Sequence, residues 1–214
     1  MIRIENIRIQ FGDTVVLDDI NMELKEGNIY GFVGRNGSGK TMLMKCICGF
    51  VLPTSGTIFV NNKIVGKEID IPDDIGIIIE NPGFLPNYSG FKNLQLLAMI
   101  QNKIGKKEIK QAIQMVGLDP DSKKHVGKYS LGMRQRLGLA QALMENPKIL
   151  LLDEPMNGLD NEGVEEIRSL LLKLKKEGKL IIIASHTKED IRLLCDQVFY
   201  MDHGKIIQIE RKSA

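Results

Sequence analysis

Eight consecutive residues form a glycine-rich loop that ends in a lysine and a threonine. The segment 34–41, GRNGSGKT, satisfies the pattern G-x-x-x-x-G-K-[ST] and lies between a strand-like apolar run and a helix-like segment. Glycines let backbone N–H groups converge on an anion, and the helix N-terminus adds partial positive charge. We expect Lys40 to reach the β- and γ-phosphates of a nucleotide and Thr41 to offer its hydroxyl to Mg²⁺. The predicted phosphate-binding residues are Gly34, Asn36, Gly37, Ser38, Gly39, Lys40 and Thr41.

Two neighbouring carboxylates form the second chemical element. The apolar run Ile149–Leu152 is typical of a buried parallel strand, and Asp153 and Glu154 follow it directly. This places both carboxylates at the carboxyl edge of a sheet, where α/β proteins bind their ligands. We expect Asp153 to hold Mg²⁺ and Glu154 to act as general base on an attacking water. The alternative is a strand that ends in two polar residues without a catalytic role. The phosphate loop upstream in the sequence argues against this alternative.

The elements that position these residues alternate between strands and helices. Short apolar runs predict strands at 29–33, 75–79, 149–152 and 180–184, and the first third of the chain reads as strands and turns. Segments 93–100, 107–116 and 131–145 have helical composition and spacing. We therefore predict an α/β domain whose core comprises about 1–83 and 146–214, with a helical insert at about 84–145. The segment 198–209, around His203 and Gly204, predicts a closing hairpin.

Composition excludes several classes of protein. The chain has 214 residues, 43% of them apolar, and a net charge of +2, which argues against disorder and against nonspecific nucleic-acid binding. Its apolar runs are strand-length, whereas a membrane helix needs about 20 residues. The start lacks the apolar region of a signal peptide. We expect Cys46, Cys48 and Cys195 to be buried reduced thiols rather than metal ligands, and the lysine clusters to be solvated helix faces.

With the two nucleotide motifs and three further elements, the chain resembles the ATP-binding subunits of ABC transporters over essentially its whole length. The segment 130–137, SLGMRQRL, is similar to the family's signature, which usually reads LSGGQ-x-QR. Residues 157–160, NGLD, resemble the D-loop, and His186 resembles the switch histidine. Phe11 stands where an aromatic commonly stacks on adenine, although a core role is the alternative. The resemblance implies a P-loop NTPase core with an N-terminal antiparallel β-subdomain and an inserted α-helical subdomain.

The resemblance also implies how the site is completed. In this family two subunits pack head to tail, so that the signature of one closes over the phosphate loop of the other. Ser130 and Gly132 would then bind the γ-phosphate, Asp160 would belong to the nucleotide site as part of the D-loop, and His186 would contact the γ-phosphate and position the water. For a post-strand histidine outside such a motif set, an ordinary polar surface residue is the alternative.

Two departures from the family pattern narrow the resemblance. Leu131 and Met133 replace Gly and Gln in the signature, but Ser130 and Gly132 are retained. Glu80 stands where the family usually has Gln, and as a carboxylate it is a candidate Mg²⁺ ligand. With the following Asn81-Pro82, it resembles the lantibiotic-immunity and bacitracin-resistance exporters, so an antimicrobial peptide or antibiotic is the implied cargo. The alternative is that Glu80 is a tolerated substitution that indicates no subgroup.

These observations predict an ATPase that uses ATP and Mg²⁺ to drive export through separate transmembrane permease subunits. It would pair with a second ATPase subunit, identical or paralogous, and lie in the cytoplasm on the inner face of the cell membrane. We expect no nucleic-acid partner. One alternative is a soluble ABC-type ATPase that is not coupled to transport. Another is a regulatory module that binds ATP without hydrolysing it, against which Glu154 and His186 argue.

Overall fold

A computed structural model describes residues 1–80 and 83–212. Its larger sheet has six strands, which follow the spatial order β10 (Lys205–Arg211), β9 (Gln197–Asp202), β3 (Ile29–Val33), β8 (Leu180–Ala184), β7 (Ile149–Asp153) and β6 (Ile75–Ile78). Neighbouring strands are parallel from β9 to β6, and only β10 runs antiparallel to its neighbour. The carboxyl ends of β3, β8, β7 and β6 therefore share one edge of the sheet, which is where the predicted phosphate loop, His186, Asp153 and Glu80 follow.

A second, antiparallel sheet of four strands lies beside the first. Its spatial order is β2 (Thr14–Leu24), β1 (Ile2–Phe11), β4 (Ser55–Val60) and β5 (Lys63–Ile64). The pairing of β1 shifts register between Ile4 and Ile7, where Asn6 adopts a left-handed backbone with φ 50°. This irregularity explains why the apolar residues of the first strand alternate imperfectly, since an extra residue reverses the face that follows it. The sheet confirms the expected N-terminal antiparallel β-subdomain.

Helix α1 (Lys40–Ile47) joins the two sheets. Its Leu43, Met44, Cys46 and Ile47 are buried in one hydrophobic cluster with residues of both sheets. Burial raises the pKa of the Cys46 thiol to about 12. All three cysteines of the chain are buried and free. The cysteines therefore pack as small apolar residues, as the sequence predicted.

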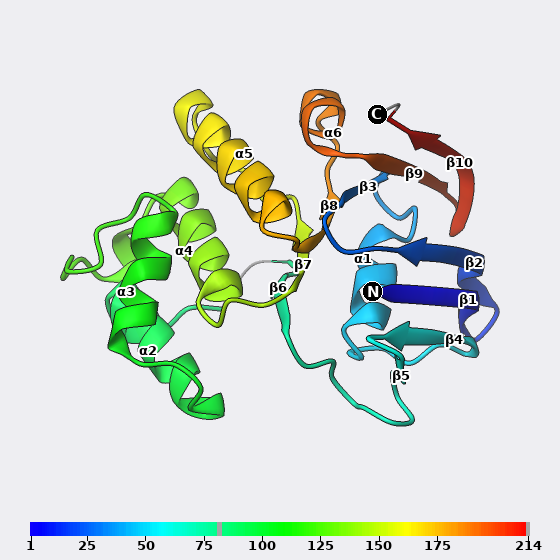
Figure 1. The fold of residues 1–214 in the computed structure, drawn as a ribbon, viewed down its shortest axis with the longest axis horizontal. Helices are drawn as coiled ribbons and strands as arrows, with labels where there is room; N and C mark the ends of the chain where they lie inside the picture. Colours follow the sequence, from blue (N-terminus) through cyan, green and yellow to red (C-terminus); the bar gives the residue numbers. More distant parts are fainter. Residues whose placement is uncertain (81–82, 213–214) are drawn as a thin grey trace.

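The helices of the predicted insert gather on the opposite side of the molecule from the four-stranded sheet (Figure 1). They are α2 (Gly90–Gln101), α3 (Lys106–Met115) and α4 (Leu131–Leu143), with a short 3₁₀ turn, η1 (Val126–Lys128), before α4. Helices α5 (Asn161–Lys176) and α6 (Lys188–Leu194) connect β7 to β8 and β8 to β9. Within the described residues, no helix has both the length and the apolar character needed to cross a membrane.

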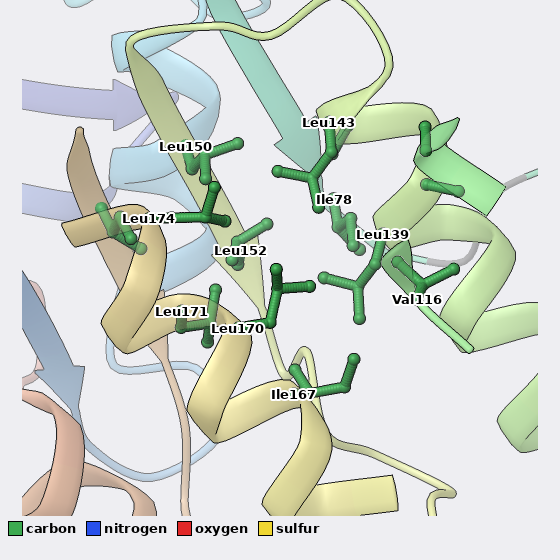
Figure 2. Packing of buried hydrophobic residues seen from close by; sticks show 14 of the residues in the cluster. Ile78, Val116, Leu139, Leu143, Leu150, Leu152, Ile167, Leu170, Leu171 and Leu174 are labelled. Atoms are coloured by element: carbon green, nitrogen blue, oxygen red, sulfur yellow. The ribbon is translucent and has the colours of Figure 1, made fainter. Parts of the chain in front are cut away.

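A second hydrophobic cluster fastens the insert to the larger sheet. Figure 2 shows side chains of α4, α5, β6 and β7, together with one residue just after α3, packed into one interior. The labelled residues are Ile78, Val116, Leu139, Leu143, Leu150, Leu152, Ile167, Leu170, Leu171 and Leu174. Because α4 packs directly on the sheet, its N-terminal end is held in a fixed relation to the carboxyl edge.

Candidate functional site

The glycine-rich loop lies between β3 and α1, as predicted, and two of its glycines are required by geometry. A Cβ on Gly34 would lie 2.2 Å from the carbonyl oxygen of Met201, so no side chain fits there. Gly39 has φ 105°, a conformation that side-chain-bearing residues rarely adopt, and it is the N-cap of α1. The loop is anchored to the β9–β10 hairpin, since the N–H of Gly204 donates to the carbonyl of Ser38 at 3.1 Å.

The ammonium of Lys40 lies inside this loop. Its Nζ donates to the carbonyl oxygens of Gly34 at 2.7 Å and Arg35 at 3.1 Å, and the residue is only 8% exposed. No side chain caps the N-terminus of α1. The N–H groups of the first turn therefore remain available to an anion beside the Lys40 charge, which is the arrangement that binds phosphate. The loop thus fits the triphosphate that its sequence predicts.

Thr41 and Asp153 come together from different elements. The Thr41 hydroxyl at the start of α1 donates to Asp153 Oδ2 at the end of β7 over 2.7 Å. A hydroxyl and a carboxylate are hard oxygen donors of the kind that Mg²⁺ prefers. In the described part of the chain, no cluster of three or more His, Cys, Asp or Glu side chains could hold a metal alone. Two protein ligands completed by phosphate oxygens and water are the usual set for Mg²⁺, so the donors fit that ion.

Glu154 and His186 form the second pair at this edge. Glu154 Oε1 accepts from the backbone N–H of His186 at 3.1 Å and lies 2.9 Å from His186 Nδ1. The backbone of Glu154 is left-handed, with φ 50°, and its N–H donates to the carbonyl of Ala184 at 2.8 Å. The carboxylate is thereby held in one place while 30% of the side chain stays exposed, so water can reach it. This arrangement suits a general base.

The predicted signature residues lie at the N-terminus of α4. Ser130 is its N-cap and accepts a hydrogen bond from the N–H of Met133 at 3.1 Å. Gly132 faces the loop after β7, because a Cβ there would lie 2.8 Å from the carbonyl oxygen of Gly158. Among the described residues, no hydrogen bond joins Ser130 or Gly132 to the loop 34–41. The structure therefore leaves this end of α4 facing outward, and Leu131 beside it is 57% exposed.

Three other predicted site residues occupy distinct places. Phe11 ends β1 and is 54% exposed, which excludes the alternative of a core residue and leaves its ring accessible for stacking. Asp160 is the N-cap of α5, where its carboxylate accepts from the N–H of Gly163 at 2.9 Å. Glu80 follows β6 with φ 62°, and its carboxylate pairs with Lys45 Nζ on α1 at 2.6 Å. The neighbouring Asn81 and Pro82, part of the subgroup resemblance, lie outside the described residues.

Two residues that sequence reasoning left without a role contact the site. Lys45 holds Glu80, and Gln135 of α4 donates to the carbonyls of Glu154 at 3.0 Å and Pro155 at 3.1 Å. Gln135 belongs to the signature-like segment, and this could have marked it as a functional residue. The spacing of that segment does not show which backbone carbonyls Gln135 contacts. Nothing in the sequence marked Lys45 as a functional residue except its position about one helical turn after the phosphate loop.

The comparisons with known proteins agree with this geometry. A family model described as ABC transporter matches residues 17–157. Among the relatives, the uncharacterized ABC transporter ATP-binding protein YybJ of Bacillus subtilis is 44% identical over 99% of this chain and 97% of its own. The bacitracin transport ATP-binding protein BcrA of Enterococcus faecalis is 41% identical over 97% of this chain and 68% of its own. The lantibiotic transport ATP-binding protein SrtF of Streptococcus pyogenes is 37% identical over 97% and 89%.

Solved structures share the fold along the whole chain. The dimeric structure of MJ0796, a bacterial ABC transporter cassette, matches with a TM-score of 0.88 and 26% identity over 99% of this chain and 98% of that one. CbiO1 from Clostridium perfringens, part of the ABC transporter complex CbiONQ, matches with a TM-score of 0.84 and 32% identity over 98% and 88%. The predicted fold class, an ABC ATPase core with an antiparallel β-subdomain and added helices, is thereby confirmed.

Proposed function

The chain belongs to the ABC transporter family, and from that membership we propose that it hydrolyses ATP to drive export of a peptide antibiotic through separate membrane subunits. The observation that carries the proposal is the meeting of five polar side chains at the carboxyl edge of the parallel sheet. They are the Lys40 ammonium, the Thr41–Asp153 contact of 2.7 Å, and the Glu154–His186 contact of 2.9 Å.

Each group has a separate task in this proposal. The phosphate loop and Lys40 bind the triphosphate, and the glycines allow the backbone to approach it closely. Thr41 and Asp153 hold Mg²⁺, with Glu80 as a further candidate ligand. The bound ion supplies charge neutralisation to the phosphoryl group. Glu154 accepts the proton of the attacking water, and His186 keeps its carboxylate in position. Phe11 is accessible to stack on the base.

The outward-facing end of α4 supports a dimer as the active form. Ser130 and Gly132 present a hydroxyl and backbone N–H groups at a helix N-terminus, which suits a phosphate supplied from outside the chain. In a head-to-tail dimer, this end would reach the γ-phosphate bound by a second ATPase subunit, and Asp160 would stand beside it. The related cassette MJ0796 has been solved as a dimer.

Two adjoining cavities support contact between the insert and a membrane subunit. A cavity of about 630 Å³ is lined by residues of β6, α2 and α4, and a second of about 430 Å³ adjoins it at Phe50 and Ile77. Phe50, Ile71 and Ile100 at their rims are 51%, 58% and 79% exposed. The second cavity reaches Lys45 and Glu80. An apolar segment of a membrane subunit seated there would sense the loop that follows β6. This contact would hold the chain on the inner face of the membrane.

The names of relatives support the class of cargo. BcrA is named for bacitracin transport and SrtF for lantibiotic transport, at 41% and 37% identity along nearly all of this chain. The substrate that we propose for this chain is accordingly an antimicrobial peptide or antibiotic.

Purification of the chain from its native membrane, followed by identification of co-purifying proteins, tests the transport role. A co-purifying protein with several apolar spans supports it, whereas an active ATPase recovered without membrane proteins favours the soluble alternative. Cross-linking sharpens the test. A cross-linker at Asn87 or Tyr88, which are both exposed, is expected to capture the membrane subunit. The matched control is Arg3 on β1, and capture from Arg3 alone would contradict the assignment of the insert.

A further inference from the structure

Gln135 connects the signature helix to the backbone of the proposed general base. It lies in the second turn of α4 and is half-buried. Its Nε2 donates to two consecutive carbonyl oxygens, those of Glu154 at 3.0 Å and Pro155 at 3.1 Å. One amide side chain thus satisfies two acceptors in the loop that carries Glu154. This loop directly follows β7.

The conformation of Glu154 needs such support. Its φ of 50° is left-handed, a state that costs a non-glycine residue free energy and persists when its surroundings enforce it. The N–H of Glu154 is held by Ala184 of β8 at 2.8 Å, and its carbonyl is held by Gln135. Because the backbone conformation sets the direction of the side chain, Gln135 helps to hold the carboxylate where it contacts His186.

The neighbouring Arg136 shows that α4 is also fastened elsewhere. Its Nη1 donates to the carbonyl of Val116 at 2.7 Å and pairs with Glu166 of α5 at 2.7 Å. Its guanidinium occupies the space that side chains at Gly117 and Gly163 would need. Adjacent residues of a helix face different directions, so Arg136 anchors the helix to the residue after α3 and to α5, while Gln135 reaches the carbonyls of Glu154 and Pro155.

We propose that Gln135 is a positioning residue through which the signature end of α4 controls Glu154 of the same chain. Ser130 lies five positions before Gln135, or roughly 7.5 Å along the helix axis. A phosphate bound by Ser130 and Gly132 from the second subunit fixes α4, and Gln135 transmits that position to Glu154. Filling one ATP site of the dimer thereby completes the base of the other. This inference rests on the proposed function and its head-to-tail dimer.

Two substitutions remove the amide donors in different ways. Gln135→Leu takes away all hydrogen bonding, and Gln135→Glu keeps the shape but sets a carboxylate against the two carbonyls. We expect both to lower kcat by about 10- to 100-fold, the usual effect of a misplaced catalytic group. Binding of ATP to the monomer should stay within about twofold, and the Hill coefficient for ATP should fall toward about 1. The matched control is Gln111→Leu, an exposed glutamine on α3.

A second background separates positioning from folding. In a chain that already carries Glu154→Gln, Gln135→Leu should lower hydrolysis no further, because it acts through the missing carboxylate. Thermal unfolding should be close to that of Gln111→Leu. Wild-type kcat and Hill coefficient in both Gln135 variants, or a further loss in the Glu154→Gln background, would overturn the inference. If instead the wild-type chain and its co-purified complex hydrolyse no ATP, the proposed function itself fails.

Discussion

The two halves of the candidate site differ in how far this chain completes them. In the phosphate-loop half, Lys40 is 8% exposed, Thr41 is hydrogen-bonded to Asp153, and Glu154 is bonded to His186. In the signature half, Ser130 is exposed and contacts its own helix, and Leu131 is 57% exposed. The first half is organised by packing within the chain, whereas the second offers donors to something outside it.

This difference predicts that nucleotide binding requires only one subunit, whereas hydrolysis requires the dimer. An organised phosphate loop can hold a nucleotide in a single subunit, because its donors are already in place. In the proposed head-to-tail dimer, the signature half would add contacts only when a second subunit brings a phosphate to it. Substitutions in the first half should therefore change nucleotide affinity or chemistry, whereas substitution of Ser130 in the second half should weaken the dimer and leave the nucleotide affinity of the monomer unchanged.

Lys40→Ala is expected to have the largest effect on the phosphate-loop half of the site. The buried ammonium is expected to supply a charge-assisted contact to the phosphates in a loop that wraps around it, so nucleotide binding should be abolished. Titration with a fluorescent ATP analogue measures this. Lys67→Ala, which removes an exposed lysine, is the control and should bind as the wild type does. Unchanged affinity in Lys40→Ala would remove the phosphate-loop assignment.

Glu154→Gln should preserve the binding of ATP and slow its hydrolysis. The amide cannot take a proton from water, so turnover should fall by about 10²–10⁴, the usual contribution of a positioned base. Binding of ATP should persist, because the phosphate loop is untouched, and an ATP-bound dimer should accumulate. Steady-state hydrolysis and size-exclusion chromatography with ATP measure the two effects. Hydrolysis at the wild-type rate would place the base elsewhere.

Ser130→Gly tests the signature half in isolation. Glycine replaces a serine N-cap at a cost of only a few tenths of a kcal/mol, so the helix should remain. Loss of one hydrogen bond to a charged phosphate, worth about 1.5–3 kcal/mol, should weaken the ATP-bound dimer of the Glu154→Gln chain by about tenfold or more. Monomer affinity for ATP should not change.

The chain offers a matched control for this substitution. Ser89 is the N-cap of α2 and accepts from the N–H of Lys92 at 3.2 Å, so Ser89→Gly makes the same change at another helix. We expect it to dimerise as its parent does. Equal weakening by both substitutions in analytical ultracentrifugation would attribute the effect to helix capping and would contradict the phosphate contact.

The first half of the site was also the half that the sequence predicted best. Unbroken apolar runs identified β7 and β8 because a strand covered on both faces needs no polar alternation. The phosphate loop was recognisable because its glycines are required locally. Such features depend on nearby residues, and the structure places them where the pattern does. The bulge at Asn6 and the two-residue strand β5 were not predicted, since neither has a periodic signal.

The contacts between elements could not be predicted in the same way. The sheet order places β3 between β9 and β8 although β3 is distant from both in sequence, and the parallel pairing of β7 with β8 brings His186 to Glu154. The hydrogen bonds of Gln135 to backbone carbonyls depend on how α4 packs on the sheet. Periodicity predicts which face of an element is buried but not what that face meets. The division of the chain at about 83 and 146 remains an interpretation, because one hydrophobic cluster crosses it.

Glu80 lies beside Lys45 in the wall of the cavity of about 430 Å³, and its substitutions should have the smallest effect. Its carboxylate is paired with Lys45 at 2.6 Å, but the side chain is 66% exposed, so the pair contributes little to stability. If Glu80 moves to Mg²⁺ when ATP binds, a Gln carbonyl can fill the same position. We therefore expect Glu80→Gln to keep ATPase activity within about tenfold, which corresponds to about 1.4 kcal/mol of barrier.

Glu80→Ala should be more harmful than Glu80→Gln, because it removes the oxygen ligand altogether. Hydrolysis measured across a Mg²⁺ titration should show a higher Mg²⁺ requirement for Glu80→Ala, while thermal unfolding stays near that of the wild type. Lys45→Met provides the comparison, since it frees the carboxylate without removing it and should leave or lower the Mg²⁺ requirement. If Glu80→Ala matches the wild type at every Mg²⁺ concentration, in hydrolysis and in transport, then Glu80 is a tolerated substitution and its pairing with Lys45 is only a surface contact.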